Sequence, residues 1–422
     1  MGDRPQITLP STPEFWRSPL RGVWLTSVLG VVLLVGITLL FVTGLLSYAA
    51  YNPDLAGVND KTPGKGWLGF YLFDWPTRPY WLFRLNQGLH VTVGIALVPV
   101  LLAKLWSVIP KLFELPPARS AAHGLERLSL LLLVGGGLFE FVTGIFNVQL
   151  NYVFPGSFYT LHFYGAWVFM AAFVAHAALK LPRALQALRG RGQDDGEEPE
   201  PESGAEDSLA SPEPDAPTIS RRGALGMVGA GSLLLLATTA GQSFDGLARA
   251  TALFAPHGGG DPGTGPNGFQ INKTADSVGL TESDLGANWR LILDGVGDGL
   301  DLSREQLQEL EQHSVPLPIA CVEGWSTSDQ EWRGVRLRDL AALAGFDDDP
   351  PDVMVESLQR AGSFREVALR ANQVADPRSL LALRVNGADL SPDHGYPARI
   401  IVPAAPGVLN TKWVSRLTFG EL

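Results

Sequence analysis

Long apolar runs alternate with short polar segments over the first half of the chain. Four runs carry almost no charge, and each is long enough for the ~20 residues that an α-helix needs to cross the hydrocarbon core of a bilayer. They cover roughly residues 23–49, 84–108, 127–149 and 158–181. The first run is too long for a signal peptide and is followed by more spans. We therefore expect an all-α transmembrane four-helix bundle within residues 1–191.

A fifth apolar run covers residues 223–244 and follows the paired arginines Arg221 and Arg222. Paired arginines before a Gly- and Ala-rich apolar stretch resemble a twin-arginine export signal, here internal and retained as an anchor. The alternative is a plain fifth helix whose arginines follow the positive-inside rule. Either interpretation assigns residues 218–245 to an anchor helix.

The remainder of the chain divides into a linker and a second domain. Residues 192–217 hold ten carboxylates and no basic residue, a composition typical of a disordered linker. Residues 246–422 have the composition of a soluble protein, and we expect an α+β domain there, entered through a Gly-rich linker at 258–268. The expected strands are Trp289–Leu293, Ala398–Val402 and Trp413–Leu417, and the expected helices are Leu302–His313 and Leu337–Ala344.

Composition narrows the class of protein. Of the 422 residues, 46% are hydrophobic and only 18% are charged, which agrees with a membrane-bound part. The net charge of -11 comes almost entirely from the acidic linker, and no basic cluster with aromatic residues is present, so nucleic acid is not expected as a partner. The single cysteine, Cys321, cannot form an intrachain disulfide or an all-cysteine metal site.

Basic residues orient the bundle, because they gather at alternate ends of the spans. This pattern places the N-terminus in the cytoplasm, and it places the loops at 50–83 and 151–157 and the C-terminal domain outside a multi-pass cell membrane. The residues concerned are Arg17, Arg21, Lys104, Lys111, Arg119, Arg127, Lys180, Arg183, Arg189 and Arg191.

Two histidines lie at matching depths in different spans. His90 is near the outer end of the second span and His162 near the outer end of the fourth. Imidazoles inside a membrane usually mark a functional site, and two that face each other can bind a haem iron from both sides. Gly94 and Gly165 lie on the same helix faces and would let a porphyrin approach. The alternative is a pair of histidines that hydrogen-bond between helices.

The sequence leaves open whether His176 binds a second haem. His176 lies 14 residues after His162, on nearly the same helix face and roughly 21 Å deeper. This spacing resembles that of di-haem b-type cytochromes, but the corresponding position on the second span is Lys104, so the partner would have to be that lysine or His123. Otherwise His176 is a satisfied polar residue and Lys104 a cation that reaches the interface.

Glu140 lies in the middle of the third span, where an isolated carboxylate is costly. It either handles protons beside a quinone or hydrogen-bonds to a neighbouring helix.

The lone cysteine follows an apolar segment and precedes the sequence Val322-Glu323-Gly324-Trp325. From residue chemistry alone, such a cysteine is more often a packed thiol than a ligand. The stretch nevertheless resembles the metal-binding loop of the sulfite oxidase superfamily. That resemblance implies that Cys321 binds molybdenum beside the dithiolene of a molybdopterin, and that the cofactor carries the chemistry.

Further motifs extend this resemblance over most of residues 268–418. Asn272 and Thr274 resemble a segment that touches the pterin. His394, Arg399 and Lys412 resemble the family's second motif, in which basic residues bind the cofactor phosphate. Without the resemblance, His394 would be a turn histidine and Arg399 a surface strand residue. The other matching positions are Lys273, Leu381, Asn386, Gly387, Gly395, Pro397, Pro403 and Trp413.

Departures from the family pattern bear on the substrate. Residues 322–330 contain no basic residue to hold an oxyanion and do contain Glu323 and Asp329, so sulfite is not the expected substrate. The loop is closer to the bacterial methionine sulfoxide reductase branch, whose usual basic and aromatic stretch is not matched at Ala404–Asn410. The sequence also resembles actinobacterial proteins that fuse such a domain to a haem-bearing bundle.

Together these features predict a membrane-bound molybdenum oxidoreductase. Electrons would pass between the quinone pool, haem b and an extracytoplasmic Mo-molybdopterin site that transfers an oxygen atom. The cytochrome part favours reduction of a sulfoxide- or N-oxide-like substrate, with a small oxyanion as another option. Membrane lipid and a respiratory-chain protein are further expected partners. The alternatives are a non-enzymatic electron-transfer or assembly subunit and a haem-only quinone reductase.

Overall fold

The computed structural model describes residues 9–59, 73–113, 115, 120–149, 153, 156–189, 211, 213–243, 251–252, 266–347 and 349–422. The chain forms two compact units. The helical unit comprises Met1–Phe41, Val93–Ile145 and Tyr164–Leu236. The sheet unit comprises Val42–Thr92, Phe146–Phe163 and Ala237–Leu422, so it includes one end of several helices. Most of the expected linker at 192–217 and of the Gly-rich run at 258–268 lies outside the described residues.

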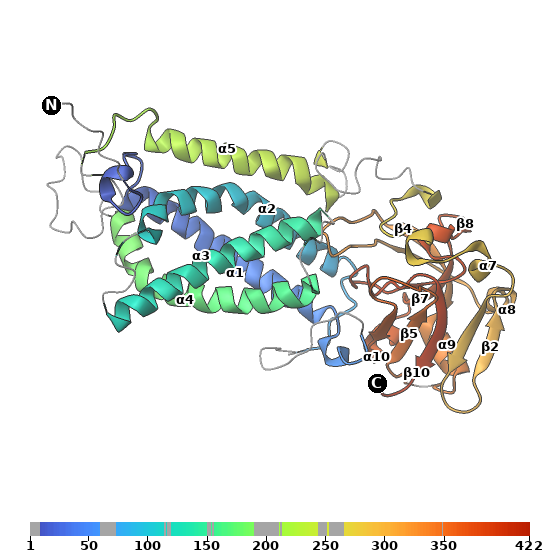
Figure 1. The fold of residues 1–422 in the computed structure, drawn as a ribbon. Helices are drawn as coiled ribbons and strands as arrows, with labels where there is room; N and C mark the ends of the chain where they lie inside the picture. The colour runs from blue at the N-terminus through green and yellow to red at the C-terminus, as the bar shows by residue number, and fades with distance from the viewer. Residues whose placement is uncertain are drawn as a thin grey trace. The chain divides into compact units, whose positions relative to one another are not determined.

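Five helices in the described part of the chain are long and apolar enough to cross a membrane, as the sequence predicts. α3 begins earlier than expected because the Ser120 hydroxyl accepts a hydrogen bond from the backbone N–H of His123 (3.2 Å) and caps the helix. The helices, coloured blue to yellow-green in Figure 1, are α1 (Val23–Ala49), α2 (Leu82–Val108), α3 (Ala121–Val148), α4 (Phe158–Arg189) and α5 (Arg221–Thr239).

One apolar cluster holds the helical unit together. It receives side chains from all five helices, so α5 packs with the other four within this unit. Residues at this cluster include Leu29 and Ile37 of α1, Leu97 of α2, Leu133 of α3, Phe169 of α4, and Leu225 and Val228 of α5.

The described residues of the sheet unit form two five-stranded sheets, which confirms the expected α+β domain. The strand order in one sheet is β2-β1-β10-β5-β6, with β1 and β10 parallel; in the other it is β3-β4-β7-β8, and β9 pairs with β7. The strands are β1 (Arg290–Asp294), β2 (Leu300–Ser303), β3 (His313–Leu317), β4 (Gln330–Arg336), β5 (Val353–Ser357), β6 (Glu366–Leu369), β7 (Leu380–Val385), β8 (Ala388–Asp389), β9 (Arg399–Ile401) and β10 (Val414–Phe419).

Short helices join these strands. The expected helix at Leu337–Ala344 is present as α9, but the one expected at Leu302–His313 is much shorter. Ser303 ends β2 and caps α8, since its hydroxyl accepts from the N–H of Gln306 (3.2 Å), and the chain is already in β3 at His313. The short helices are α7 (Glu282–Leu285), α8 (Arg304–Glu309), α9 (Leu337–Leu343) and α10 (Ala371–Ala375).

The segment between α1 and α2 is part of the sheet unit's core. Tyr51, Trp75 and Phe83 pack in the same apolar cluster as β1, β5 and β10. The Trp75 indole donates to the carbonyl of Ala404 (2.7 Å), and the Asn52 amide donates to the carbonyl of Ala368 (3.1 Å). The described residues of the loop expected at 50–83 are therefore bound tightly to the C-terminal domain.

Candidate active site

Cys321 lies in a tight turn after β3 and is buried. Its N–H donates to the carbonyl of Trp325 (2.8 Å), and its carbonyl accepts from the N–H of Gly324 (3.1 Å). Gly324 has φ +93°, a left-handed conformation that favours glycine. The Gly-Trp sequence after the cysteine thus closes a small loop that fixes the backbone on both sides of the thiol.

Helix ends within the sheet unit hold this loop in place. The carbonyl of Val322 accepts hydrogen bonds from Gln87 Nε2 of α2 (2.6 Å) and Asn147 Nδ2 of α3 (3.4 Å). The Ser243 hydroxyl donates to the carbonyl of Gly324. A Cβ at Gly324 would lie 2.7 Å from the Val91 side chain, so the loop packs directly on α2.

A second segment, residues 404–410, lies against the other side of the cysteine loop. The N–H of Gly407 donates to the carbonyl of Ala320 (2.7 Å), and a Cβ at Gly407 would lie 3.1 Å from that oxygen and 3.5 Å from the Cα of Cys321. Only a small residue leaves this approach open. The segment that does not match the methionine sulfoxide reductase branch therefore forms part of the wall beside the cysteine.

Arg399 and Lys412 are brought together beside Gly395. A Cβ at Gly395, whose φ is +108°, would lie 3.2 Å from the Cβ of Arg399 and 3.1 Å from the Cβ of Lys412. Arg399 Nη1 donates to the carbonyl of His394 (3.1 Å). Lys412 Nζ donates to the carbonyls of Lys273 (2.8 Å) and Asp393 (2.7 Å). The two cations of the second motif thus share one buried region.

Both Arg399 and Lys412 are buried, and burial disfavours their charged forms. Burial lowers the pKa of Arg399 to about 9 and the pKa of Lys412 well below its ordinary value. Arg399 Nε is buried and has no hydrogen-bond partner in the described part of the chain. Burial, with the charge of Glu323, raises the pKa of the Cys321 thiol well above its ordinary value. A metal cation would stabilise the thiolate of Cys321, and an anion would stabilise the charged forms of Arg399 and Lys412. A phosphate-bearing molybdopterin with its metal supplies both, so these three residues fit this cofactor.

The other expected cofactor residues have different surroundings. The Asn272 amide nitrogen lies 4.0 Å from the Cys321 sulfur. The Thr274 hydroxyl accepts from the N–H of Ser277 (3.2 Å) and caps a short turn. Both ring nitrogens of His394 lie 3.1 to 3.2 Å from protein oxygens, and burial lowers the pKa of this histidine to about 3. Asn272 is thus close to the sulfur, whereas Thr274 and His394 hold local structure. Their contact with a cofactor stays a prediction.

His90 and His162 face each other inside the sheet unit. Their ring centroids lie 6.4 Å apart and the ring planes are 80° apart. His90 Nδ1 lies 3.0 Å from the Thr43 hydroxyl of α1, and Phe158 stacks on His162 at 5.0 Å. A histidine nitrogen lies about 2 Å from a bound transition metal, so two imidazoles on opposite sides of one ion have centroids roughly 6 Å apart. The observed centroid distance is close to this value, and a metal or haem between these rings stays a prediction.

One of the two glycines expected beside a porphyrin, Gly165, meets side chains of α3. A Cβ at Gly165 would clash with Glu140 Oε1 and would lie 2.8 Å from the Phe139 ring. The glycine thus accommodates the Glu140 carboxyl, and the approach of a porphyrin to it stays a prediction. The glycine that approaches the His90 ring is Gly44 of α1, whose Cβ would lie 3.4 Å from Cε1.

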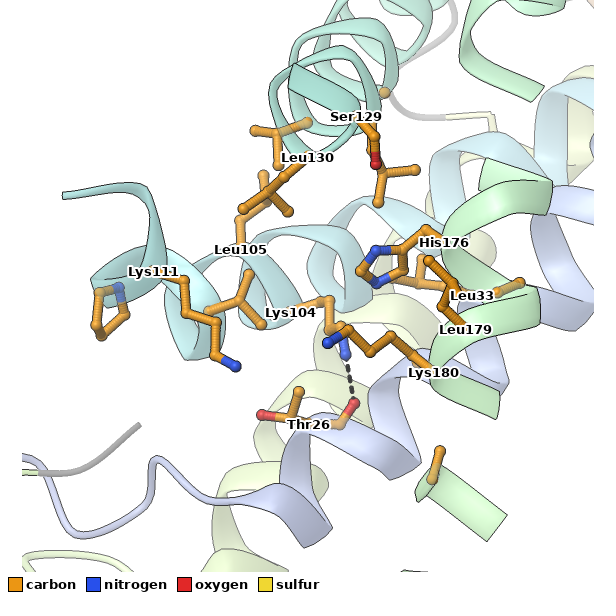
Figure 2. Close-up of a pocket in the computed structure, with 18 of the residues that line it drawn as sticks. Thr26, Leu33, Lys104, Leu105, Lys111, Ser129, Leu130, His176, Leu179 and Lys180 are labelled. Carbon is orange, nitrogen blue, oxygen red and sulfur yellow. Dashed lines mark hydrogen bonds between the residues drawn. The ribbon is translucent and has the colours of Figure 1, made fainter. Parts of the chain in front are cut away.

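The three side chains considered for a second haem line one cavity in the helical unit. His176 of α4, Lys104 of α2 and His123 of α3 all contribute to its wall. Figure 2 shows His176 and Lys104 directed into this space and the hydrogen bond from Lys104 Nζ to the carbonyl of Thr26 (2.7 Å). Lys104 is thus already bonded to a backbone oxygen, and a second haem at His176 stays a prediction.

Gln87 and Asn147 are functional candidates that the sequence did not reveal. Amide side chains inside apolar helices are costly unless they are hydrogen-bonded. Their presence in apolar spans was the one feature of the sequence that could have identified Gln87 and Asn147. Gln87 lies three residues before His90 on the same helix, and its own oxygen accepts from the Ser47 hydroxyl (2.8 Å). The partner in each case is a backbone carbonyl, which sequence patterns do not identify.

Comparison with known proteins agrees with this geometry. A family model described as oxidoreductase molybdopterin binding domain matches residues 279–421. Mitochondrial sulfite oxidase of Mus musculus is 31% identical over 146 residues, covering 29% of this chain and 27% of the mouse protein. Uncharacterized oxidoreductase YuiH of Bacillus subtilis is 31% identical over 132 residues, covering 31% of this chain and 65% of that protein.

NADH nitrate reductase of Volvox carteri is 34% identical over 167 residues, covering 32% of this chain and 19% of its own. The match spans about a quarter of the length of the mouse sulfite oxidase. The residues matched by the family model include Cys321, Arg399 and Lys412. The C-terminal part of the chain therefore carries a molybdopterin-binding oxidoreductase domain that is similar to part of sulfite oxidase.

Proposed function

We propose that this protein is a membrane-bound oxidoreductase in which electrons pass between quinol, a haem b held by His90 and His162, and a molybdenum site at Cys321. The observation that carries the proposal is the seating of the Cys321 loop on α2, through Gln87 and Val91, next to His90. Such a contact would bring a molybdenum site at Cys321 close to the helix that carries a haem ligand.

At the molybdenum site, Cys321 would supply the thiolate ligand, and Arg399 and Lys412 would bind the anionic end of the pterin cofactor. When bound, this cofactor supplies two-electron redox chemistry and oxygen-atom transfer. The chain's own contribution is positional. Hydrogen bonds fix the loop backbone on both sides of the thiol, and burial keeps bulk water away from it.

At the haem site, two neutral imidazoles would bind iron from opposite sides, a coordination suited to electron transfer rather than to substrate binding. The Thr43 hydroxyl near His90 Nδ1 would fix the ring so that Nε2 is the nitrogen directed at the metal. Glu140 keeps its proposed role in handling protons from quinol, and its contact with Gly165 supports equally the role of a structural partner between α3 and α4.

Gln87 would provide the route between the two sites. The path runs from the Cys321 sulfur along the backbone to the Val322 carbonyl, across one hydrogen bond of 2.6 Å to Gln87, and along α2 to His90. Electrons tunnel more readily through covalent and hydrogen bonds than through gaps. This path needs no rearrangement of either site.

The substrate class follows from the charges around the cysteine. No Lys or Arg occurs in residues 322–330, and Glu323 is buried beside the thiol. Arg399 and Lys412 are taken up by the cofactor in this proposal. A neutral oxygen donor such as a sulfoxide or an N-oxide therefore suits the site better than sulfite.

A quinol-driven kinetic experiment tests this function. We expect a quinol analogue to reduce the haem of the detergent-purified protein, and dimethyl sulfoxide or trimethylamine N-oxide to reoxidise it, as followed by absorbance in a stopped-flow instrument. In Cys321→Ser, quinol should still reduce the haem, but the oxide should not reoxidise it. Equal reoxidation in both proteins would support the haem-only reductase. Reduction of the haem by sulfite would reverse the proposed direction of electron flow.

A further inference from the structure

The helical unit contains a cavity of about 1100 Å³ between α1, α2, α3 and α4. We propose that this cavity binds an anionic phospholipid, with the phosphate among its basic side chains and the acyl chains along its apolar wall. The proposal is independent of the molybdenum site at Cys321 and of the haem site at His90 and His162, because it concerns a different set of residues.

Positive charge dominates the polar part of the cavity. Lys104, Lys111, Arg127 and Lys180 line it, together with two histidines, and no aspartate or glutamate of the described residues does so. In Figure 2, Lys104 and Lys180 extend into the same space from α2 and α4, and Lys111 approaches from beyond the end of α2. An anion in this space would offset the mutual repulsion of these cations.

Lys104 shows why the charge needs a partner. Its side chain lies against Gly30 of α1, where a Cβ would be 3.2 Å from Nζ, and its Nζ donates to the neutral carbonyl of Thr26. A lysine inside a membrane span is costly when only neutral dipoles surround it. Arg127 likewise donates to backbone carbonyls, those of Lys111 and Leu112.

The apolar part of the cavity favours a lipid over a free anion. Leu33, Leu105 and Leu130 line it, and Leu179 and Leu115 at its wall are 69% and 62% exposed. A soluble phosphate would leave these side chains uncovered, whereas acyl chains would cover them. Basic pockets between transmembrane helices commonly bind anionic lipid headgroups.

Native mass spectrometry of the full chain tests the proposal. The delipidated protein in detergent is titrated with dioleoyl phosphatidylglycerol and, separately, with dioleoyl phosphatidylcholine. We expect the anionic lipid to bind roughly tenfold more tightly, and Lys104→Gln and Lys180→Gln each to weaken it by roughly fivefold. Arg189→Gln is the matched control, since Arg189 is an exposed cation of α4 that does not line the cavity, and it should leave binding unchanged.

Several results would overturn the proposal. Equal binding of the two lipids, or an equal loss in Arg189→Gln, would show that no specific headgroup site exists. Displacement of the lipid by inorganic phosphate would indicate a free-anion site, and displacement by a quinone analogue would indicate a quinone site. A haem-to-protein ratio that falls by half in His176→Leu, with lipid binding unchanged, would assign the cavity to a second haem.

Discussion

Gln87 Nε2 of α2 donates a hydrogen bond of 2.6 Å to the backbone carbonyl of Val322, the residue after Cys321. This bond joins the loop that carries the proposed metal ligand to the helix that carries His90. The same carbonyl accepts a longer bond, 3.4 Å, from Asn147 of α3. Two side chains from different helices thus fix one atom of the cysteine loop.

Gln87→Leu removes the shorter of these bonds while keeping a similar volume. We expect electron transfer from haem to the molybdenum site to slow by roughly tenfold, with unchanged haem spectrum and molybdenum content. Stopped-flow reoxidation of the haem by substrate measures this rate. Asn147→Leu is the matched control, and its effect should be smaller because its bond is longer. Equal effects of both substitutions would mean that Gln87 acts only through packing.

Loss of the Arg399 charge should stabilise the cofactor-free protein but weaken its binding of molybdopterin. Its charge is buried and its Nε has no hydrogen-bond partner among the residues that the structure describes, so Arg399→Met should raise the free energy of unfolding of the cofactor-free protein by about 1 to 3 kcal/mol. The same change should reduce molybdopterin content after expression in a competent host. Thermal unfolding and pterin analysis measure the two effects. Arg416→Met, at a half-exposed cation of β10, should change both very little. A stability loss in Arg399→Met would contradict this account.

His394 should make the stability of the cofactor-free domain depend on pH. Burial lowers the pKa of this histidine to about 3, whereas in the unfolded chain it titrates near 6.5. Between these values the unfolded state binds the extra proton, so stability falls as pH drops from about 7 towards 3. Chemical denaturation at a series of pH values measures the slope, which should be shallower in His394→Asn. An identical slope in that variant would show that other groups control the acid sensitivity.

Gly324 should tolerate no side chain. Its φ of +93° is unfavourable for other residues, and an added Cβ would lie 2.7 Å from Val91. We expect Gly324→Ala to lower the molybdenum content and to slow haem reoxidation, because the loop can no longer sit against α2. Val91→Ala in the same chain should restore only part of the loss, since the backbone strain persists. Wild-type behaviour of Gly324→Ala would show that the contact with α2 is dispensable.

Apolar run length was enough to predict the helices, because a membrane span requires a continuous stretch of uncharged residues. All five expected spans are helical in the structure. The pairing of His90 with His162 could also be predicted, since matching depth on two helices limits which side chains can meet. Helix ends were less predictable, as at Ser120, where a single capping hydroxyl decides the first residue.

Contacts between distant segments could not be predicted from the sequence. Glu140 occupies the space beside Gly165, and Gln87 bonds to a backbone carbonyl 235 residues away. The loop at 50–83 was expected only to lie outside the membrane, yet its Trp75 is 2% exposed and lies in the core of the sheet unit. Single sequences record which residues are apolar or polar but not which partner each one finds.

The proposed function requires that one chain holds both a molybdenum cofactor at Cys321 and a haem at His90 and His162. Elemental analysis and reduced-minus-oxidised spectra of the wild type, Cys321→Ser and His90→Ala measure both groups. We expect about one molybdenum per chain and a bis-histidine haem spectrum in the wild type. We also expect loss of molybdenum but not haem in Cys321→Ser, and loss of haem but not molybdenum in His90→Ala. A wild-type protein from a molybdopterin-competent host that contains haem but no molybdenum, or molybdenum but no haem, would contradict it.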